Sequence, residues 1–411
     1  MALVKIAWRS IWRNRRRTLI TLSSIVLCLA IAVFFIAAQH GVYDRLVDEA
    51  VRMQSGHLCV EHAEYIEAPA IDLVVRDVSA LRKRIERIHG VESTKALVIG
   101  QGVAKSASGS VGVAVLGVEP EVEMRSSPLA RKIVRGSYLA EEDGASAVVG
   151  AELVKKLKLD IGKKLVISSN DMGGDLVEEQ LRVKGIFETG STEVDAYVIQ
   201  IPLGFARKLY GMGDGLSGEA TRLGIVLADA DERGEVMDGV AGLLAGEQAV
   251  RTWEEVMPDL AAFIEMDVVS NYIFQGIILF LILFTIFNTL LMSVLERKRE
   301  FAVLLALGTS NGRIKIQILL ESAFIALLGV AFGLLVGGLV TGYFQAEGID
   351  LSSLMEEGMS ISGFAMDMVM YPALTAELLA VLGAVVFAAT LLMSLYPMGQ
   401  IKRIPVADVL R

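Results

Sequence analysis

Hydrophobic and polar positions divide this chain into four long apolar runs separated by polar stretches of very different length. Each run approaches or exceeds the roughly 20 residues that an α-helix needs to cross the hydrocarbon of a bilayer. We expect membrane-spanning helices at residues 19–39, 271–295, 316–343 and 374–397. One run is near the N-terminus and three are in the last third, so the pattern predicts a membrane protein with a large domain between its first two helices.

The polar stretch 40–270 alternates between short strand-like runs and a few amphipathic helices. Residues 98–104 and 111–118 flank Ser106–Ser110, which is a hairpin signal. The fold class predicted is a membrane protein with four transmembrane α-helices, arranged 1+3, and a large α+β extracytoplasmic domain between the first and second. We expect two subdomains, the inner one built from segments near both ends of the stretch.

Basic residues indicate the orientation of the chain. Residues 1–18 carry Lys and Arg without any acid, and further Lys and Arg lie in segments 296–315 and 398–411. The short loop 344–373 is acidic and has no Lys or Arg. Because basic loops stay in the cytoplasm, we expect both termini there, with the large domain and the 344–373 loop in the periplasm.

The N-terminal segment 1–18 has its own amphipathic pattern. Val4, Trp8, Ile11 and Trp12 share one helical face, with basic residues elsewhere, which favours a cytoplasmic helix in the membrane interface. A plain basic flank is the alternative. A cleaved signal peptide would also begin this way, but the apolar run is longer than a typical signal core, which favours an uncleaved anchor.

Composition excludes several classes of function. Of the residues, 53% are hydrophobic and 21% charged, which suits a membrane anchor with a folded domain. The net charge of −9 and the lack of a basic block in the polar stretch argue against nucleic-acid binding. Cys28 and Cys59 cannot easily meet, and the four histidines are scattered. The sequence predicts no catalytic residue and no metal site.

A short helix is predicted between the second and third spans. The second apolar run ends in Glu296–Glu300, the helical pattern continues into residues 296–315, and Gly308 is placed to stop it. Phe301, Leu304, Leu305 and Gly308 share one face. A basic flank with a short loop is the alternative, but the apolar face after the charges favours an amphipathic cytoplasmic helix.

At this segment a family resemblance becomes visible. The order Glu296-Arg297, Glu300, Leu304-Leu305, Gly308 and Glu321 resembles the region before the third span of FtsX-like ABC permeases, which include macrolide-exporter-type and lipoprotein-releasing-type proteins. The N-terminal Ala7–Leu19 and Gly56-His57-Leu58 are similar to the lipoprotein-releasing (Lol-type) branch, and the C-terminal Ile404–Arg411 is similar to the usual C-terminal ending of the family. Individual motifs are loose, but their order along nearly the whole chain is specific.

This resemblance implies a permease subunit, not an enzyme, in the bacterial inner (cytoplasmic) membrane. Its partners would be two copies of a cytoplasmic ABC ATPase, a second permease subunit that is either identical or a paralogue, a lipoprotein or lipid cargo, and a periplasmic chaperone. The chain has no phosphate-binding P-loop motif, so ATP and Mg would sit on the separate ATPase and no cofactor is expected here. Segment 296–315 would be the coupling helix, with these contact residues: Arg297, Lys298, Arg299, Glu300, Leu304, Leu307 and Gly308.

Polar residues and glycines inside the spans are further candidates. Glu321 lies at the inner edge of the third span, where an unpaired acid is costly, so we expect an ion pair with Arg297 or Lys298. Asn288 is expected to hydrogen-bond across helices. Gly329, Gly333 and Gly337 form a ridge for close helix packing, either within the chain or at a subunit interface.

The sequence therefore predicts an ABC permease subunit that moves a lipoprotein, or another lipidated or amphipathic molecule, from the outer leaflet of the inner membrane. The alternative is an FtsX-like mechanotransmission protein that actuates a periplasmic cell-wall hydrolase without moving cargo. A membrane-anchored enzyme is disfavoured because no catalytic constellation is found.

Overall fold

The computed structural model describes residues 2–13, 15–212, 218–350, 360–361, 364–365 and 369–400. The chain forms two compact units. The first, here called the helical unit, comprises Met1–Tyr43, Glu265–Leu351 and Val369–Arg411. The second, the α+β unit, comprises Asp44–Ile264 and Ser352–Met368. Residues 401–411 of the predicted tail lie outside the described residues, as do residues 351–359, 362–363 and 366–368 of the predicted loop 344–373.

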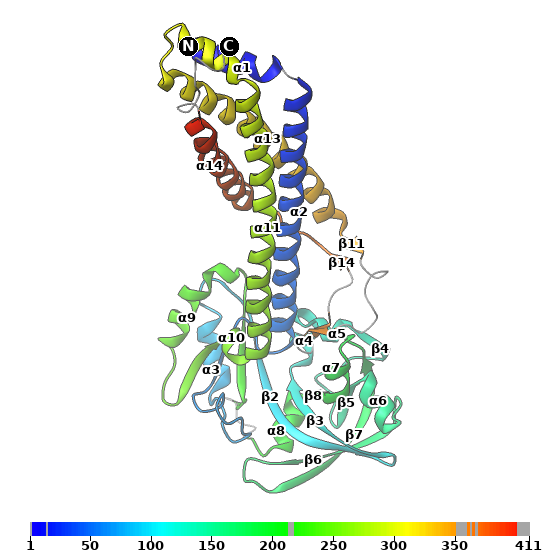
Figure 1. Ribbon diagram of the computed structural model, residues 1–411. Coiled ribbons are helices and arrows are strands. Elements are labelled where there is room, and N and C mark those ends of the chain that lie inside the picture. Colours follow the sequence, from blue (N-terminus) through cyan, green and yellow to red (C-terminus); the bar gives the residue numbers. More distant parts are fainter. Residues whose placement is uncertain are drawn as a thin grey trace. The chain divides into compact units, whose positions relative to one another are not determined.

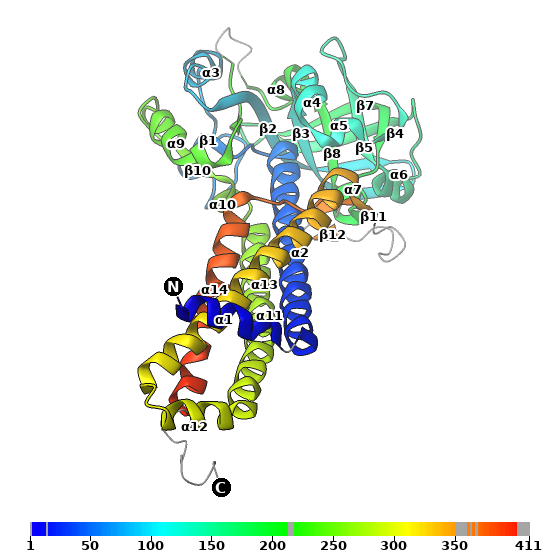
Figure 2. The same ribbon diagram turned by 90° about the horizontal axis from the view of Figure 1, so that it is seen from above.

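Among the described residues, the helical unit contains four helices that are long and apolar enough to span a membrane. Figures 1 and 2 show these helices, with the shorter α1 (Ala2–Arg13) and α12 (Lys298–Ala306) at one end. The bounds are α1 Ala2–Arg13, α2 Arg15–Met53, α11 Pro258–Glu296, α12 Lys298–Ala306, α13 Asn311–Glu347 and α14 Ala376–Gln400. A two-stranded ladder pairs β11 (Ile349–Asp350) with β14 (Val369–Met370).

Two of these helices are much longer than their apolar runs predict. α2 continues past the predicted end at residue 39 to Met53, and α11 begins at Pro258 rather than at 271. The extensions are amphipathic: Leu46 and Ala50 of α2 are buried against Leu260 of α11 and neighbouring side chains. Proline suits the first position of α11, because its missing N–H would be unpaired there anyway.

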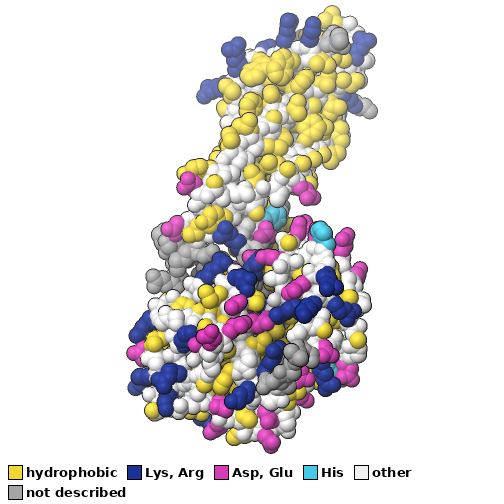
Figure 3. Space-filling view, turned by 180° about the vertical axis from the view of Figure 1, so that it is seen from behind, with side chains coloured by type: hydrophobic (Ala, Val, Ile, Leu, Met, Phe, Trp, Pro, Cys, Tyr) yellow, Lys and Arg dark blue, Asp and Glu magenta, His cyan; other side chains and the backbone are white. Residues whose placement is uncertain are grey.

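Apolar side chains from all four long helices meet in one cluster. Ile25 and Leu29 of α2, Ile286 of α11 and Val386 of α14 are almost fully buried, and Leu334 of α13 packs on them. The outward surface of this unit is largely hydrophobic, with Lys and Arg gathered at one end (Figure 3). An apolar outer surface around an apolar core is typical of a helix bundle in lipid.

The α+β unit is built on a ten-stranded mixed sheet. Its long strand β2 runs through both halves of the sheet (Figure 1), and β6 pairs with β2 and β7 beside the main path. The remaining strands follow the order β10-β1-β9-β2-β3-β8-β5-β7-β4. The bounds are β1 Leu58–His62, β2 Val91–Ser106, β3 Gly109–Val118, β4 Ile133–Gly136, β5 Ser146–Gly150, β6 Lys164–Asn170, β7 Leu176–Phe187, β8 Val198–Pro202, β9 Arg222–Leu227 and β10 Gln248–Thr252.

One half of the sheet contains β1, β9 and β10, which come from both ends of the polar stretch, as predicted for the inner subdomain. The two halves are not separate, because both include strand β2. Alternate residues of β5 point to opposite faces: Ala147 and Val149 join the main core, and Val148 joins a second cluster. The helices of this unit are α3 Val78–Ile85, α4 Pro120–Ser126, α5 Pro128–Arg131, α6 Ala151–Leu157, α7 Thr192–Tyr197, α8 Leu203–Leu209, α9 Arg233–Ala241 and α10 Trp253–Val256.

Candidate functional site

The short helix α12 is the centre of the candidate site. It lies between α11 and α13, and the helix boundary is sharp because Gly308 adopts φ +88°, a left-handed conformation that glycine takes without strain. The amides of Gly308 and Thr309 donate to the carbonyls of Leu305 and Leu304 and so close the end of the helix. The helix proper therefore covers Lys298–Ala306, within the predicted segment 296–315.

One face of α12 is packed against the ends of α11 and α13. Phe301 is 1% exposed and Ala302 fully buried, in contact with a cluster that includes Val294, Ile314 and Ile318. Leu304 packs at the edge of this cluster. The predicted apolar face is thus largely used to hold α12 in place, which makes the opposite face the one available to a partner.

A chain of charged groups ties α12 to three other helices. Arg297, between α11 and α12, donates from Nη1 to Glu321 Oε2 on α13 at 2.6 Å and from Nε to Glu300 Oε2 on α12 at 3.1 Å. Gln317 Nε2 donates to the other oxygen of Glu321 at 3.0 Å. Arg13 of α1 donates to Glu300 from the opposite side. Arg13, Glu300, Arg297 and Glu321 therefore form a continuous chain of ion pairs. This chain connects α1 to α12, and the α11–α12 junction to α13.

Burial differs along this ionic chain. The side chains of Arg297 and Glu321 are only 13% and 10% exposed, whereas Arg13 and Glu300 are about half exposed. The Arg297 guanidinium also lies 5.0 Å from the centre of the Phe301 ring, a cation–π contact. The hydrogen bond from Arg13 lowers the pKa of Glu300 and raises the pKa of Arg13, so this pair stays charged at neutral pH.

The predicted site residues on α12 divide into two groups. Arg297 points inward to Glu321, as the sequence predicts for this pair, and is not on the exposed face. Lys298, Arg299, Leu307 and Gly308 are exposed. Val303, which the sequence analysis did not single out, is 45% exposed and Leu307 is 78% exposed. Arg299, Val303 and Leu307 follow one another at four-residue spacing and form one exposed stripe, because residues four apart share a helix face.

The intramembrane candidates have different outcomes. Asn288 is exposed on α11, and its predicted interhelical hydrogen bond stays a prediction. The three glycines of α13 face α2. A methyl group at Gly329 would lie 2.7 Å from Ile25, at Gly333 2.8 Å from Leu29, and at Gly337 3.0 Å from Ala30. The glycine ridge therefore serves packing within this chain.

An apolar groove of about 460 Å³ lies between α2, α11 and α14 in the helical unit. Its walls are aliphatic, and two polar side chains, His40 and Gln275, lie among them. The other lining residues are Ala32, Ile36, Tyr272, Gly276, Ile278, Leu279, Ile282, Leu378, Val381, Leu382 and Val385.

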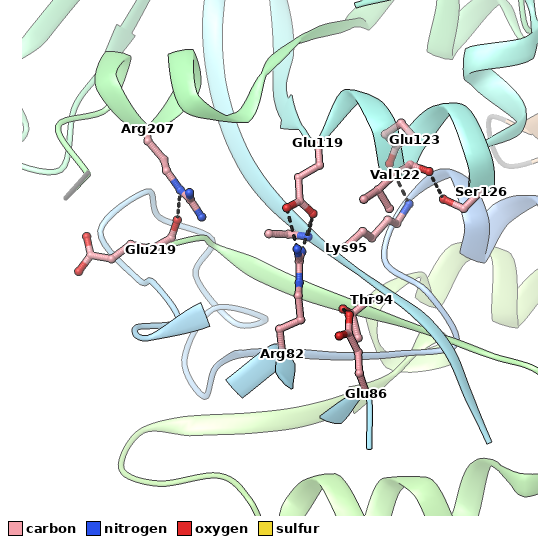
Figure 4. A network of polar contacts seen from close by, with 11 residues as sticks. Arg82, Glu86, Thr94, Lys95, Glu119, Val122, Glu123, Ser126, Arg207 and Glu219 are labelled. Carbon is pink, nitrogen blue, oxygen red and sulfur yellow. Dashed lines mark hydrogen bonds and ion pairs between the residues drawn. The ribbon is translucent and has the colours of Figure 1, made fainter. Parts of the chain in front are cut away.

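A polar network in the α+β unit joins residues of α3, β2 and α4 (Figure 4). Arg82 binds Glu119 through two hydrogen bonds of 2.8 and 2.5 Å, and Glu119 also accepts from the amide of Ala96 at 2.9 Å. Beside it, the buried pair Lys95–Glu123 has an N–O distance of 3.3 Å. In the described part of the chain no cluster of His, Cys, Asp or Glu could hold a metal ion.

Sequence reasoning did not identify Arg13 or Lys95 as members of these networks. Arg13 is one of several basic residues in segment 1–18. It differs from the arginines that follow it only in sharing a helix face with Arg9, four residues earlier on α1. Lys95 lies at the end of a polar run in β2, directly before an apolar run. A lysine at such a position is rarely buried without a partner, and this was the signal that could have identified it.

Two family models match the chain. The one described as "FtsX-like permease C-terminal" matches residues 272–406, and the one described as "MacB-like periplasmic core domain" matches residues 18–243, more than half of the chain. Four apolar helices, an α+β domain after the first and a short helix after the second define an ABC transporter permease. The chain belongs to the FtsX-like and MacB-type permease family, and the predicted fold class is confirmed.

Relatives with curated names agree with this family. The lipoprotein-releasing system transmembrane protein LolC of Xylella fastidiosa is 24% identical over 72% of both chains. LolE of Haemophilus influenzae is 22% identical over 98% of both. The macrolide export ATP-binding/permease protein MacB of Nitrobacter winogradskyi is 25% identical over 80% of this chain but only 50% of its own length.

Solved structures of extracytoplasmic domains are also similar to part of the chain. The extracellular domain of the ABC-type transporter YknZ from Gram-positive bacteria covers 47% of this chain and 99% of its own, at 15% identity and a TM-score of 0.35. The periplasmic region of MacB from Actinobacillus actinomycetemcomitans covers 52% of this chain and 95% of its own, at 9% identity and a TM-score of 0.37.

Proposed function

We propose that this permease subunit couples ATP hydrolysis by a separate cytoplasmic ATPase to movement of its α+β domain. This movement would extract or export a lipoprotein, or another lipidated or amphipathic molecule, from the outer leaflet of the inner membrane. The observation that carries the proposal is the position of α12, which is packed through Phe301 and ion-paired through Glu300 and Arg297 to its neighbouring helices.

A force on the exposed stripe of α12 would reach two spans at once. Arg297 joins α12 to α11 through the backbone and to α13 through Glu321, so α12 cannot shift without straining both connections. Breaking a buried pair by displacing one partner costs about 3–5 kcal/mol, which favours movement of the helices together. α2 and α11 run without a break from residues of the helical unit into residues of the α+β unit, so a continuous backbone is available for transmission.

The partners follow from the same proposal. The relatives named ATP-binding/permease proteins are matched over only about half of their length, and this chain has no P-loop. In this proposal, ATP and Mg are bound by two copies of a separate ATPase. A second permease subunit, identical or a paralogue, would complete the transporter in the inner membrane, with both termini in the cytoplasm. A periplasmic chaperone would receive the cargo.

The cargo class is supported by the names of the LolC and LolE relatives and by the groove between α2, α11 and α14. Each buried CH₂ group of an acyl chain contributes about 0.8 kcal/mol, so an aliphatic groove can retain a lipid anchor. His40 and Gln275 provide polar atoms for the head of such a molecule.

The coupling assignment is tested in the purified transporter reconstituted into vesicles. We expect Glu300→Gln, and separately Arg299→Ala, to leave ATP hydrolysis in place while transfer of lipoprotein to a soluble acceptor falls at least tenfold. Arg313→Gln is the matched control, because it removes an exposed charge from the nearby start of α13. Normal transfer by both α12 variants would contradict the assignment.

The molecules that copurify with the complex distinguish a transporter from the alternative, an FtsX-like mechanotransmission protein. Purification in mild detergent followed by mass spectrometry should recover lipoprotein or lipid with a transporter. Recovery of a periplasmic cell-wall hydrolase without lipoprotein would favour an FtsX-like actuator instead.

A further inference from the structure

We propose that α1, Arg297 between α11 and α12, and Gln317 of α13 form a binding site for the phosphodiester headgroup of an anionic phospholipid. The site is an open pocket of about 490 Å³ in the helical unit. Its walls combine guanidinium groups with indole rings. The lining residues are Ile6, Trp8, Arg9, Ser10, Trp12, Arg13, Arg297 and Gln317.

α1 is oriented by its packing on α13. Ala7 and Ile11 are buried, and the Trp8 ring makes an edge contact with Phe324 of α13 at 5.4 Å between ring centres. Trp8 and Trp12 are nevertheless 41% and 37% exposed. Indole rings held half-exposed at the end of a spanning helix are typical of the headgroup level of a bilayer, where an apolar ring with a polar N–H is favoured.

The charge of the pocket suits a monoanion. Three guanidinium groups line it, those of Arg9, Arg13 and Arg297. Two carboxylates bind them: Glu300 pairs with Arg13 and Arg297, and Glu321 pairs with Arg297. Three positive and two negative groups leave one positive charge, and a phosphodiester carries one negative charge. Arginine is suited to this role because its planar fork can donate two parallel hydrogen bonds to phosphate.

A lipid fits this pocket better than a soluble phosphate. Ile6 is 50% exposed at the same site as the two indoles, so the walls offer apolar area beside the charges. An inorganic phosphate would gain nothing from that area, whereas a lipid places its glycerol and first methylenes there. Basic pockets beside cytoplasmic helix ends are the usual binding sites for anionic headgroups.

Such a site would connect bilayer composition to the coupling helix. Arg13 contributes both to the pocket and to the contact with Glu300 on α12. A bound phosphodiester therefore shares the cation that positions α12. This regulatory part rests on the proposed coupling function, whereas the binding site itself does not.

Binding is tested in full-length protein by lipid quenching of tryptophan fluorescence. The chain has three tryptophans, and Trp253→Phe leaves only Trp8 and Trp12 as reporters. The protein is placed in phosphatidylcholine vesicles containing a minor fraction of brominated phosphatidylglycerol, or the same fraction of brominated phosphatidylcholine. We expect several-fold stronger quenching by the brominated anionic lipid, since one cation near a charged bilayer contributes about a fivefold preference.

The matched variants are Arg9→Gln and Lys5→Gln. Both remove one positive charge from α1, but only Arg9 lines the pocket. We expect Arg9→Gln to abolish most of the lipid preference and Lys5→Gln to keep it. Equal quenching by the two brominated lipids, or equal loss in both variants, would overturn the site. Reversal of quenching by millimolar inorganic phosphate would overturn the assignment to lipid.

A second readout separates binding from regulation. In the complex with its ATPase, ATP hydrolysis should change with the phosphatidylglycerol fraction, and Arg9→Gln should remove that dependence. If brominated phosphatidylglycerol quenches more strongly but the rate of ATP hydrolysis does not depend on the phosphatidylglycerol fraction, the regulatory part is overturned and the binding site stands.

Discussion

The ammonium group of Lys95 lies 2.6 Å from the carbonyl oxygen of Arg52, one residue before the end of α2. The last carbonyls of a helix have no partner within the helix and carry a partial negative charge, so a buried cation there satisfies both needs. Lys95 and its second partner Glu123 are 2% and 1% exposed. Within the α+β unit, Lys95 of strand β2 therefore contacts both the end of α2 and helix α4. Figure 4 shows Lys95 beside Glu123 of α4.

We therefore expect Lys95→Met to lower the stability of the α+β unit by about 3–5 kcal/mol, because Glu123 is left buried and unpaired. Adding Glu123→Leu should recover much of the loss, since a buried pair replaced by apolar groups is often tolerated. Thermal unfolding measures both, followed by fluorescence of Trp253 in a background in which Trp8 and Trp12 are replaced by Phe. Lys155→Met, at an exposed pair with Glu152, is the control and should leave stability almost unchanged, because exposed ion pairs contribute little. An equal effect of both lysine changes would contradict the role of Lys95.

The exposed stripe of α12 predicts how the ATPase docks. Introducing Asp at Val303 or Leu307 places a charge in the centre of the proposed contact, where desolvation without a partner is costly. We expect each variant to reduce copurifying ATPase at least tenfold while the permease itself remains folded. Met124→Asp, at an equally exposed apolar side chain of the α+β unit, should have no effect. Undiminished copurification by both α12 variants would place the docking face elsewhere.

The packing of α13 on α2 predicts opposite effects for two glycines of the same helix. Gly333→Ala should destabilise the helical unit by about 1–3 kcal/mol, because its methyl group would lie 2.8 Å from the buried Leu29. Gly342→Ala meets nothing within 4 Å and should be neutral or slightly stabilising, since alanine favours helix. Thermal stability in one detergent distinguishes them. A loss of stability in both variants would indicate that helix flexibility, rather than close packing, matters at these positions.

Burial raises the pKa of the Cys59 thiol to about 12. The raised pKa keeps the thiol protonated at neutral pH, and a protonated thiol is much less reactive than a thiolate. We expect Cys59 in a Cys28→Ser background to resist maleimide in folded protein and to react after denaturation. A cysteine introduced by Ser108→Cys, at the exposed hairpin turn, should react within minutes. Rapid labelling of Cys59 in folded protein would show that β1 opens.

Elements with strong local patterns were predictable. The apolar runs located four helices that can span a membrane, and the hairpin of β2 and β3 was expected from Ser106–Ser110. The extension of α11 back to Pro258 was not expected, because residues 258–270 are amphipathic and gain helical stability only by packing on α2. Helix α4 and strand β10 are short, and short elements give too few periods to be recognised.

The candidate site was predictable in part for the same reason. The Arg297–Glu321 pair was anticipated because a charge at a membrane edge needs a partner, and Arg297 and Lys298 were expected at the same edge. The exposed stripe of α12 was not predictable. Local periodicity identifies an apolar face of α12, but it does not show that Phe301 and Ala302 on that face are already buried against other helices. Arg13 and Glu300 lie 287 residues apart, and no local pattern joins them.

Chain-local quantities were therefore determined by the amino-acid order alone: apolar length, helical period, charge placement and the absence of a P-loop. These depend on near neighbours, whose spacing the backbone dictates. Which face of each helix is covered, which carbonyl Lys95 binds and which guanidinium reaches Glu300 were decided only by tertiary structure. Those contacts join residues distant in sequence, and their free energy exists only once the intervening chain has been ordered.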